Sequence, residues 1–144
     1  MSLVNEINGT VQLGGTFSTQ SATNTVSFTG AMNITQNITF TKIGQMGIIE
    51  IGIMQSSSTG LGGDIISPAS IFPIGFEPAP VPYQDNPILG IYGLPITHSL
   101  DPITYNGYIN IDSNGIMRIG PFITDSGGSQ IGILQKISIP YITN

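Results

Sequence analysis

The sequence predicts an all-β fold, an antiparallel β-sandwich that is jelly-roll-like and has no significant helix. Three observations lead to this prediction: β-branched residues dominate while alanine is rare, glycines recur every few positions, and several segments alternate apolar with polar residues. Alternation with a period of two is typical of strands with one buried face, and frequent glycines favour turns over helices. Short strands separated by turns indicate a sandwich or a barrel.

The chain is expected to form one domain over residues 1–144. No change in composition divides it, no repeat of fixed period occurs, and the length suffices for one core. Residues 1–37 form either the first strands of this domain or an N-terminal arm. Early strands are predicted at 10–13 and 25–29, joined by a connection rich in Ser, Thr and Gly.

The next two strands are predicted to form a hairpin. The first lies within 31–43 and the second within 48–54, joined by a tight turn at 44–47. Alternate apolar positions give each strand a face to bury. These positions are Ile38, Phe40, Ile49, Ile51 and Ile53.

Residues 55–63 are rich in Ser and Gly and are predicted to form a loop. A glycine-rich loop can cradle a phosphate when a helix and usually a lysine follow it. Asp64-Ile65-Ile66-Ser67-Pro68 follows instead, so we interpret the segment as a connection without a phosphate site.

Residues 68–87 carry most of the prolines. Proline donates no hydrogen bond to a sheet, so the segment is expected along an edge or across the end of the sandwich. Its apolar residues that require burial are Ile71, Phe72, Ile74 and Phe76. Strands are expected to resume at 88–92, and 131–142 supplies one or two more. Alternation in that last segment places Ile137, Ile139 and Tyr141 on one face of the strand.

The segment 105–119 has the alternation of a half-buried hairpin around Ser113-Asn114-Gly115. A three-residue loop over 113–115 keeps apolar residues opposite apolar ones, whereas a two-residue loop would mix the faces. The resulting pairs are Ile111 with Met117, Ile109 with Ile119, and Asn110 with Arg118. The sequence therefore predicts a type I turn with a G1 bulge, in which Gly115 takes the left-handed conformation.

Charged residues make up only 8% of the chain, against about 25% in an average globular protein. The net charge of −5 and the lack of a basic stripe argue against nucleic acid as a partner. The surface must consist of Ser, Thr, Asn, Gln and Gly. This composition reflects either a coding bias toward Asn and Ile or burial of the surface against copies of the chain, and we favour the second.

No targeting or membrane segment is predicted. No stretch approaches the ~18 apolar residues of a membrane span, and residues 1–6 lack the basic and apolar regions of a signal peptide. The absence of cysteine excludes disulfides and thiolate metal sites. Sequons at Asn8, Asn33 and Asn37 are explained by chance in an Asn- and Thr-rich chain.

The sequence predicts no catalytic site, no metal site and no cofactor. No nucleophile motif accompanies His98, which we interpret as a surface or interface residue, although three copies around a threefold axis could chelate zinc. The eight carboxylates are scattered singly and give no indication of a glycosidase pair. Asp112 resembles the start of a calcium loop, but the closing Glu is absent and its turn role explains it.

Carbohydrate binding is the binding chemistry that the sequence leaves open. Aromatic rings pack on the C–H groups of a pyranose, while planar polar groups bond its hydroxyls. The candidate residues are Tyr83, Gln84, Asp85, Asn86, Tyr92, Tyr105 and Asn106. The preferred alternative is that these tyrosines cap the core or fill a subunit interface. The lack of tryptophan weakens the case for a sugar platform.

Three segments, in order, resemble parts of one known family. Phe40-Thr41-Lys42-Ile43-Gly44-Gln45-Met46 is similar to the aromatic-Thr-Lys-Ile-Gly strand and turn in the head domains of phage tail fibres and baseplate receptor-binding proteins. Ile71-Phe72-Pro73-Ile74-Gly75-Phe76-Glu77-Pro78 resembles their Leu-Pro-x-Gly-Phe-Arg-Pro segment, with Glu77 in place of the arginine. Residues 107–119 are similar to the hairpin that follows. Related heads occur in large DNA viruses and their virophages. Residues 1–37 show neither the collagen-like triplets nor the heptads of a fibre stem.

The resemblance implies a homotrimer that displays a receptor-binding surface, often for saccharides. We therefore expect a non-enzymatic viral structural protein, a fibre-head-like domain for host attachment or virion decoration. Expected partners are copies of itself, a host-surface glycan or protein receptor, and other virion proteins, without membrane insertion. The expected location is the virion, after synthesis in the host cytoplasm. Attachment would use polar loops around 56–63, 83–87 and 98–106. The alternative is a carbohydrate-binding module or a glycan hydrolase with an all-β fold.

Overall fold

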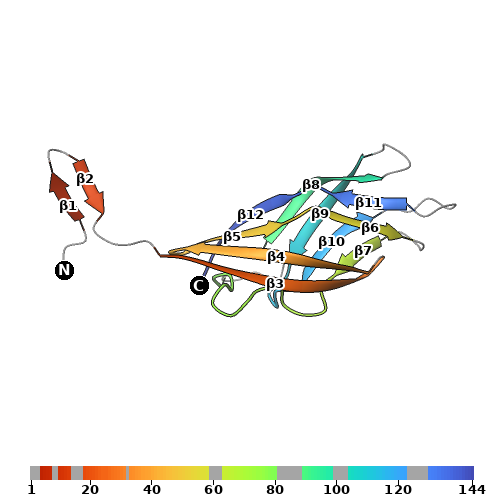
Figure 1. The fold of residues 1–144 in the computed structure, drawn as a ribbon, viewed down its shortest axis with the longest axis horizontal. Helices are drawn as coiled ribbons and strands as arrows, with labels where there is room; N and C mark the ends of the chain where they lie inside the picture. The colour runs from red at the N-terminus through yellow and green to blue at the C-terminus, as the bar shows by residue number, and fades with distance from the viewer. Residues whose placement is uncertain are drawn as a thin grey trace.

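The computed structural model describes residues 4–7, 10–13, 18–31, 33–58, 63–80, 89–98, 104–122 and 130–144. Strands are the only regular secondary structure in these ranges, which confirms the predicted all-β class (Figure 1). No helix that could cross a membrane occurs among the described residues. The strands are β1 (Val4–Ile7), β2 (Thr10–Leu13), β3 (Thr19–Gly30), β4 (Ile34–Ile43), β5 (Met46–Ile51), β6 (Met54–Ser58), β7 (Gly63–Ile66), β8 (Leu89–His98), β9 (Thr104–Ile111), β10 (Met117–Phe122), β11 (Gln130–Leu134) and β12 (Ile137–Ile142).

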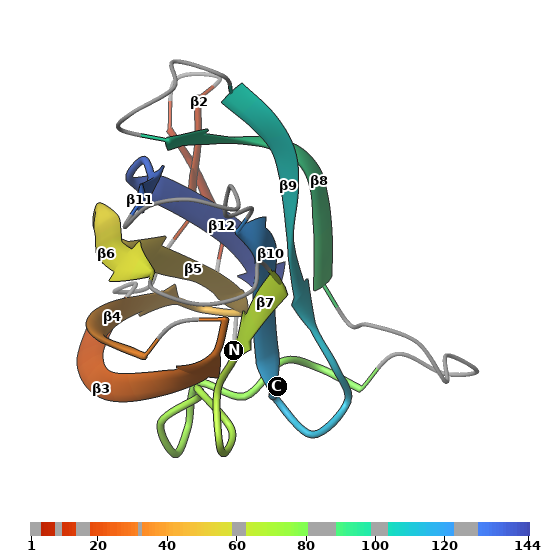
Figure 2. The same cartoon turned by 90° about the vertical axis from the view of Figure 1, so that its right-hand side faces the viewer.

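The strands form two antiparallel sheets of very different size. β1 and β2 make a separate two-stranded sheet, and the larger sheet has ten strands in the order β12-β5-β4-β3-β7-β10-β9-β8-β11-β6. This larger sheet curls until β6 contacts β4, so that it nearly closes into a barrel (Figure 2). The half formed by β12-β5-β4-β3 therefore faces the half formed by β7-β10-β9-β8, as the two layers of a sandwich do.

The core lies between these two halves and follows the alternation of each strand. Fully buried side chains include Phe28, Ile38, Phe40, Ile49, Ile51, Ile65, Ile109, Ile111, Met117, Ile119 and Phe122. The ring centroid of Phe40 lies 5.7 Å from that of Phe72 and 6.2 Å from that of Phe76, in tilted arrangements that aromatic pairs favour. Each side chain of this size stabilises the fold by about 1.5–3 kcal/mol when it is fully buried.

The hairpin predicted between 31–43 and 48–54 is confirmed as β4–β5. Gly44 begins its two-residue turn with a φ of 59°, which glycine adopts without strain. The second strand is shorter than predicted, because β5 ends at Ile51. The expectation that Ile53 faces the core is wrong: its side chain is exposed and Met54, at the start of β6, is buried instead.

Two segments predicted as connections contain strands. β3 begins at Thr19, inside the predicted Ser/Thr/Gly-rich connection, and the predicted loop 55–63 includes most of β6 and the first residue of β7. Residues 59–62 lie outside the described ranges. β3 pairs with β4 along its length, and β6 pairs with β11, which is distant in sequence. Local composition does not reveal such pairings, because strand propensity depends on tertiary context.

The proline-rich segment that follows β7 buries three of the four apolar side chains that were predicted to be buried there. Ile71, Phe72 and Phe76 are buried. Ile74 is 97% exposed, so its predicted burial is wrong. It occupies the second position of a turn over 73–76, in which the Phe76 N–H donates to the Pro73 carbonyl (3.1 Å) and Gly75 has a φ of 87°. The turn points this side chain away from the core.

Hydrogen bonds attach the same segment to strands that are far away in the sequence. The Ile71 N–H donates to the Gly115 carbonyl at the tip of the β9–β10 hairpin (3.0 Å). The Lys42 Nζ donates to the Gly75 carbonyl (3.2 Å) and to the Asn144 carbonyl (3.1 Å). One of the three basic residues of the chain is thus bound to backbone oxygens.

The β9–β10 hairpin has the predicted register. Its pairs include Ile111 with Met117, Asn110 with Arg118, and Ile109 with Ile119. The Gly115 N–H donates to the Asp112 carbonyl (2.9 Å) and the Asp112 N–H donates to the Ile116 carbonyl (3.1 Å), the bonding of a type I turn with a G1 bulge. Gly115 has a φ of 77°. The Asp112 Oδ1 accepts the N–H groups of Asn114 and Ile116, which confirms its turn role. A Cβ on Gly115 would also collide with Ser70.

The remaining strands match the predictions in part. β8 begins at Leu89, inside the predicted 88–92 strand, but it continues to His98. The predicted segment 131–142 corresponds to β11 and β12. In β12 the alternation is as expected, with Ile139 and Tyr141 buried and Ile137 partly buried against the core.

Candidate functional site

The outer face of β7, β10, β9 and β8 gathers aromatic, amide and charged side chains. Successive side chains of a strand point to opposite sides of a sheet, and Ile65, Ile109 and Ile119 fill inner positions here. We call the aromatic, amide and charged members of this outward set the tyrosine face. It consists of Asp64, Tyr92, Asn106, Tyr108, Asn110 and Arg118. In Figure 2, β8 and β9 lie on the opposite side of the molecule from β3 and β4.

Tyr92 is a strongly exposed member of the tyrosine face, with 72% of its surface accessible. It lies directly opposite Tyr108 on the neighbouring strand, and the two ring centroids are 6.4 Å apart with 34° between the planes. The ring leans over Gly90, where a Cβ would come within 3.2 Å of it. A bulge at Gly93 (φ 75°) interrupts the β8 register just after Tyr92. Such bulges commonly redirect side chains.

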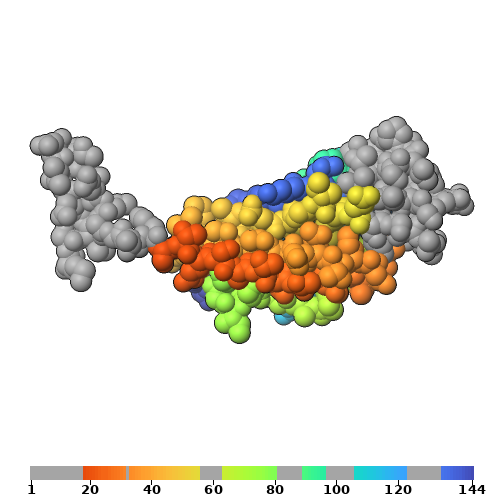
Figure 3. Space-filling model, viewed as in Figure 1, coloured from red at the N-terminus to blue at the C-terminus, as the bar shows by residue number. Residues whose placement is uncertain are grey.

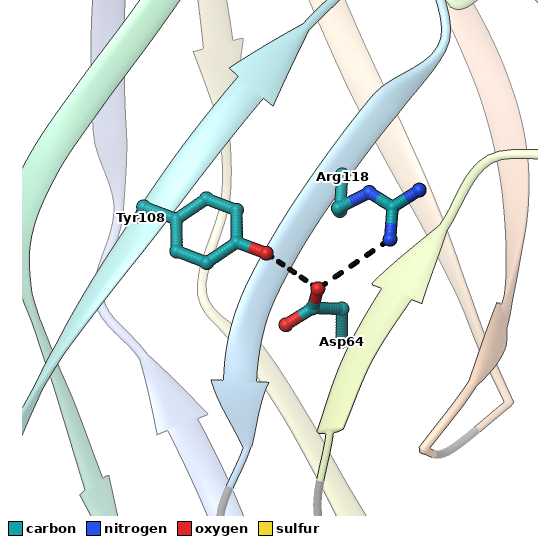
Figure 4. A network of polar contacts seen from close by, with 3 residues as sticks. All are labelled: Asp64, Tyr108 and Arg118. Atoms are coloured by element: carbon teal, nitrogen blue, oxygen red, sulfur yellow. Dashed lines mark hydrogen bonds and ion pairs between the residues drawn. The ribbon is translucent and has the colours of Figure 1, made fainter.

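Asp64 connects three strands of the tyrosine face (Figure 4). The Tyr108 hydroxyl from β9 donates to its Oδ2, and the Arg118 guanidinium from β10 lies 3.5 Å from the same oxygen. Asp64 itself comes from β7, so its side chain must cross β10 to reach Tyr108. Gly120 makes this possible, because a Cβ there would collide with the Asp64 side chain and lie 2.9 Å from its Cα.

The network holds Tyr108 in its neutral form. Burial raises the pKa of the Tyr108 phenol to about 12, and the hydrogen bond to Asp64 acts in the same direction. The phenol therefore remains a hydrogen-bond donor throughout the physiological pH range. A fixed Tyr108 ring provides a rigid neighbour for the exposed Tyr92 ring.

The structure brings two of the predicted ligand-binding residues onto one surface. Tyr92 and Asn106 both belong to the tyrosine face. Tyr105 lies in β9 opposite Ile96, and His98 ends β8. The side chains of Tyr105 and His98 lie outside the described part of the chain. The other four predicted residues, Tyr83, Gln84, Asp85 and Asn86, lie outside it entirely.

Four residues of the tyrosine face were absent from the predicted site. Tyr108, Asn110 and Arg118 could have been found, because the alternation of the 105–119 hairpin already places Asn110 opposite Arg118 on its polar side. Asp64 could not, because the pairing of β7 with β10 joins segments with no local relation in the sequence.

The side chains of this surface have the chemistry of a binding surface. Each of the four carboxylates with a described side chain already accepts an interaction within the fold. No cluster of three or more potential metal ligands occurs among the described residues. An exposed ring beside amide groups and a guanidinium can pack on an apolar surface and bond polar groups at its edge.

The opposite outer face, on β3, β4, β5 and β12, has a different chemistry. Its outward residues are Thr19, Ser21, Thr23, Thr25, Ser27, Thr29, Thr35, Asn37, Thr39, Thr41, Ile43, Met46, Ile48, Glu50, Ser138, Pro140 and Ile142. We call this the hydroxyl face. Among these outward residues only Glu50 is charged, and its Oε1 lies 3.8 Å from the Lys136 Nζ. Figure 3 shows the residues of β3 and β4 as one continuous surface.

The fold described above is also found in a viral attachment protein. A crystal structure of the reovirus attachment protein sigma1 in complex with alpha-2,3-sialyllactose matches 99% of this chain and 87% of that chain, with a TM-score of 0.56 and 13% sequence identity. At this identity the likeness establishes a shared fold.

Two avian reovirus structures are also similar. A fragment of sigmaC matches 99% of this chain and 78% of that chain, with a TM-score of 0.45 and 13% identity. The C-terminal receptor-binding domain of the fibre sigmaC matches 100% of this chain and 93% of that chain, with a TM-score of 0.43 and 14% sequence identity. No family model and no curated protein matches the sequence.

Proposed function

We propose that this protein is the receptor-binding head domain of a viral attachment protein, without enzymatic activity. The observation that carries the proposal is the fold shared with reovirus sigma1 over 99% of the chain. The resemblance of residues 40–46, 71–78 and 107–119 to phage tail-fibre heads supports the same function from the sequence. Its place is then the virion, and a phage, virophage or giant-virus origin fits the motif resemblance.

The receptor on this proposal is a host-surface glycan, bound on the tyrosine face. The exposed Tyr92 ring would pack on a pyranose, while Asn106, Asn110 and Arg118 bond hydroxyl groups around it. The sigma1 structure contains bound alpha-2,3-sialyllactose, which supports a saccharide as the ligand class. Tyr105 and residues 83–86 remain candidate contributors.

The proposed assembly is a homotrimer that joins other virion proteins. Trimers present several copies of one surface, so weak contacts between each head and a cell-surface glycan add up to firm attachment. The low fraction of charged residues supports close association between copies, since charge normally keeps proteins apart.

Binding of the purified chain to a glycan array and to host cells tests this function. Replacement of Tyr92 by alanine is expected to weaken glycan binding at least about tenfold, because central aromatic residues dominate such contacts. Ile74→Ala is the matched control, since Ile74 is also an exposed large side chain but lies outside the tyrosine face. Folded wild-type protein that binds neither glycans nor cells would contradict the proposal.

The alternative function is a carbohydrate-binding module or glycan hydrolase. The exposed Tyr92 beside Asn106 and Asn110 suits a sugar-binding module equally well. A hydrolase needs two carboxylates across one sugar bond, and each of the four described carboxylates is engaged within the fold. Glycan binding without attachment to cells favours the module, and release of reducing sugar from a bound glycan favours the hydrolase.

A further inference from the structure

Three apolar side chains line up across one end of the hydroxyl face. Ile43 on β4 is directly opposite Met46 on β5, and Met46 is directly opposite Ile142 on β12. Directly opposed residues in neighbouring strands point to the same side of a sheet. All three are exposed, by 37%, 50% and 62% respectively. We call this set the apolar row.

The residues next to the apolar row extend it without adding charge. The neighbouring register row contains Thr41, Ile48 and Pro140, of which Ile48 is partly exposed and Pro140 exposed. The first charge comes one row further, at Glu50, where Lys136 compensates it. An apolar centre with a polar rim and few charges is the usual anatomy of a protein–protein interface.

We propose that the apolar row is the contact through which copies of this chain associate. This inference deepens the assembly in the proposed function and assigns it to a surface, so it rests on that proposal.

The charge distribution of the chain favours a second copy of the chain, rather than another partner, as the molecule that covers the apolar row. The protein carries a net charge of −5, so copies repel each other over most approaches. The hydroxyl face is the exception, because its outward side chains are neutral apart from an ion pair whose charges cancel. Among the described outward residues, the apolar row has no carboxylate for a basic partner to bind and no cation to hold the headgroups of a lipid surface.

The geometry of β12 directs association to the face of the sheet rather than to its edge. β12 is the outermost strand and pairs only with β5 in the sheet order. Pro140 sits at its centre, and proline has no N–H to offer to an added strand. Copies would therefore meet through the face of the sheet rather than through its edge, with the apolar rows of three copies converging around a threefold axis at the buried centre of the contact.

Sedimentation velocity of the 144-residue chain tests this proposal. Wild-type protein is expected to sediment as an oligomer, whereas Met46→Lys and Ile142→Lys should each weaken association at least about tenfold by burying an unpaired charge. Ile74→Lys is the control, because it adds the same charge at an exposed isoleucine outside the face. Ile142→Ser removes apolar surface without adding charge and should also weaken association, which keeps the test valid if a lysine variant fails to fold.

Three outcomes overturn the proposal: a monomeric wild type, apolar-row variants that remain as associated as the wild type, or an equal loss with Ile74→Lys. If the wild type is monomeric, the remaining candidates to cover the apolar row are residues 1–17 of the chain and an unrelated protein. Glycan binding measured on the same samples separates this result from the proposed function. A monomeric variant that still binds glycan through Tyr92 leaves the receptor proposal intact.

Discussion

The two outer faces of the curled sheet share one core but differ in how their polar groups are stabilised. On the tyrosine face, Asp64, Tyr108 and Arg118 depend on one another across three strands. On the hydroxyl face, neighbours make short local contacts, such as the hydrogen bond from the Thr25 Oγ1 to the Asn37 Oδ1 (2.8 Å). The first arrangement fixes a particular geometry, and the second only covers a sheet with uncharged groups. A fixed geometry suits recognition of one ligand, whereas a uniform cover suits contact with another surface.

The largest expected difference between the faces concerns Gly120. We expect Gly120→Ala to lower the free energy of unfolding by about 2–3 kcal/mol, because the new Cβ collides with Asp64 and forces the neighbouring strand to move. Gly63→Ala is the control, since the nearest atom to its Cβ is the Ala31 Cβ at 3.8 Å, an ordinary contact. Denaturant unfolding measures both, and equal losses would show that the crossing of Asp64 over β10 is not strictly required.

A smaller difference is expected when one carboxylate is removed from each face. Asp64→Ala should cost about 1–2 kcal/mol, because the partly buried Tyr108 hydroxyl loses its acceptor. Glu50→Ala should cost no more than about 0.5 kcal/mol, because its ion pair with Lys136 is solvent-exposed and long. Unfolding curves in denaturant give both values. Similar losses would remove the contrast between an interdependent face and a locally stabilised one.

Alkaline titration separates the tyrosine face from the hydroxyl face, whose outward residues include no tyrosine. The pKa of Tyr108 is raised from 10 to about 12 by burial and by Asp64. Because its folded pKa exceeds the unfolded one, Tyr108 contributes stability that is complete below pH 10 and is lost between pH 10 and about 12. Absorbance titration of the phenols should show a late ionisation that Tyr108→Phe removes.

Tyr141 provides the comparison for that titration. Burial, and then Glu77, raise its pKa to about 12 as well, and its hydroxyl donates to the Phe76 carbonyl in the core (2.7 Å). Tyr141→Phe should therefore remove a second late ionisation without affecting the tyrosine face. A wild-type titration in which every phenol ionises near the ordinary pKa of 10 would contradict both assignments.

The smallest effect is expected on the hydroxyl face. Thr25→Val should change the free energy of unfolding by no more than about 0.5 kcal/mol, because its hydrogen bond to Asn37 is exposed and valine suits a strand. Thermal unfolding measures it. A loss above about 1 kcal/mol would mean that the hydroxyl pairs act together, as the tyrosine-face residues do.

The β9–β10 hairpin could be predicted in full from the sequence, down to its register and the conformation of Gly115. Its strands are adjacent, so the alternation on each side and the turn residues between them constrain the same pairing. The strand character of β6 could not be predicted, because its partner β11 lies far along the chain and its own composition is that of a loop.

The residues of the candidate site also differ in whether the local sequence is enough to predict them. Tyr92 and Asn106 were predicted from the chemistry of their aromatic and amide side chains, and the structure places both on the tyrosine face. Tyr108 and Arg118 follow from the hairpin register. The position of Asp64 depends on the pairing of β7 with β10, which are distant in sequence. The need for glycine at position 120 arises only because the Asp64 side chain crosses β10 there.

The three basic residues are all engaged within the fold: Lys42 with backbone oxygens, Arg118 with Asp64, and Lys136 with Glu50. At long range the molecule presents an acidic field, because its net charge is −5. An anionic receptor must diffuse toward it against this field, so its rate of encounter should rise with added salt as the repulsion is screened. This salt dependence is the reverse of the one that electrostatic steering produces. The association rate of a neutral ligand should not change with salt.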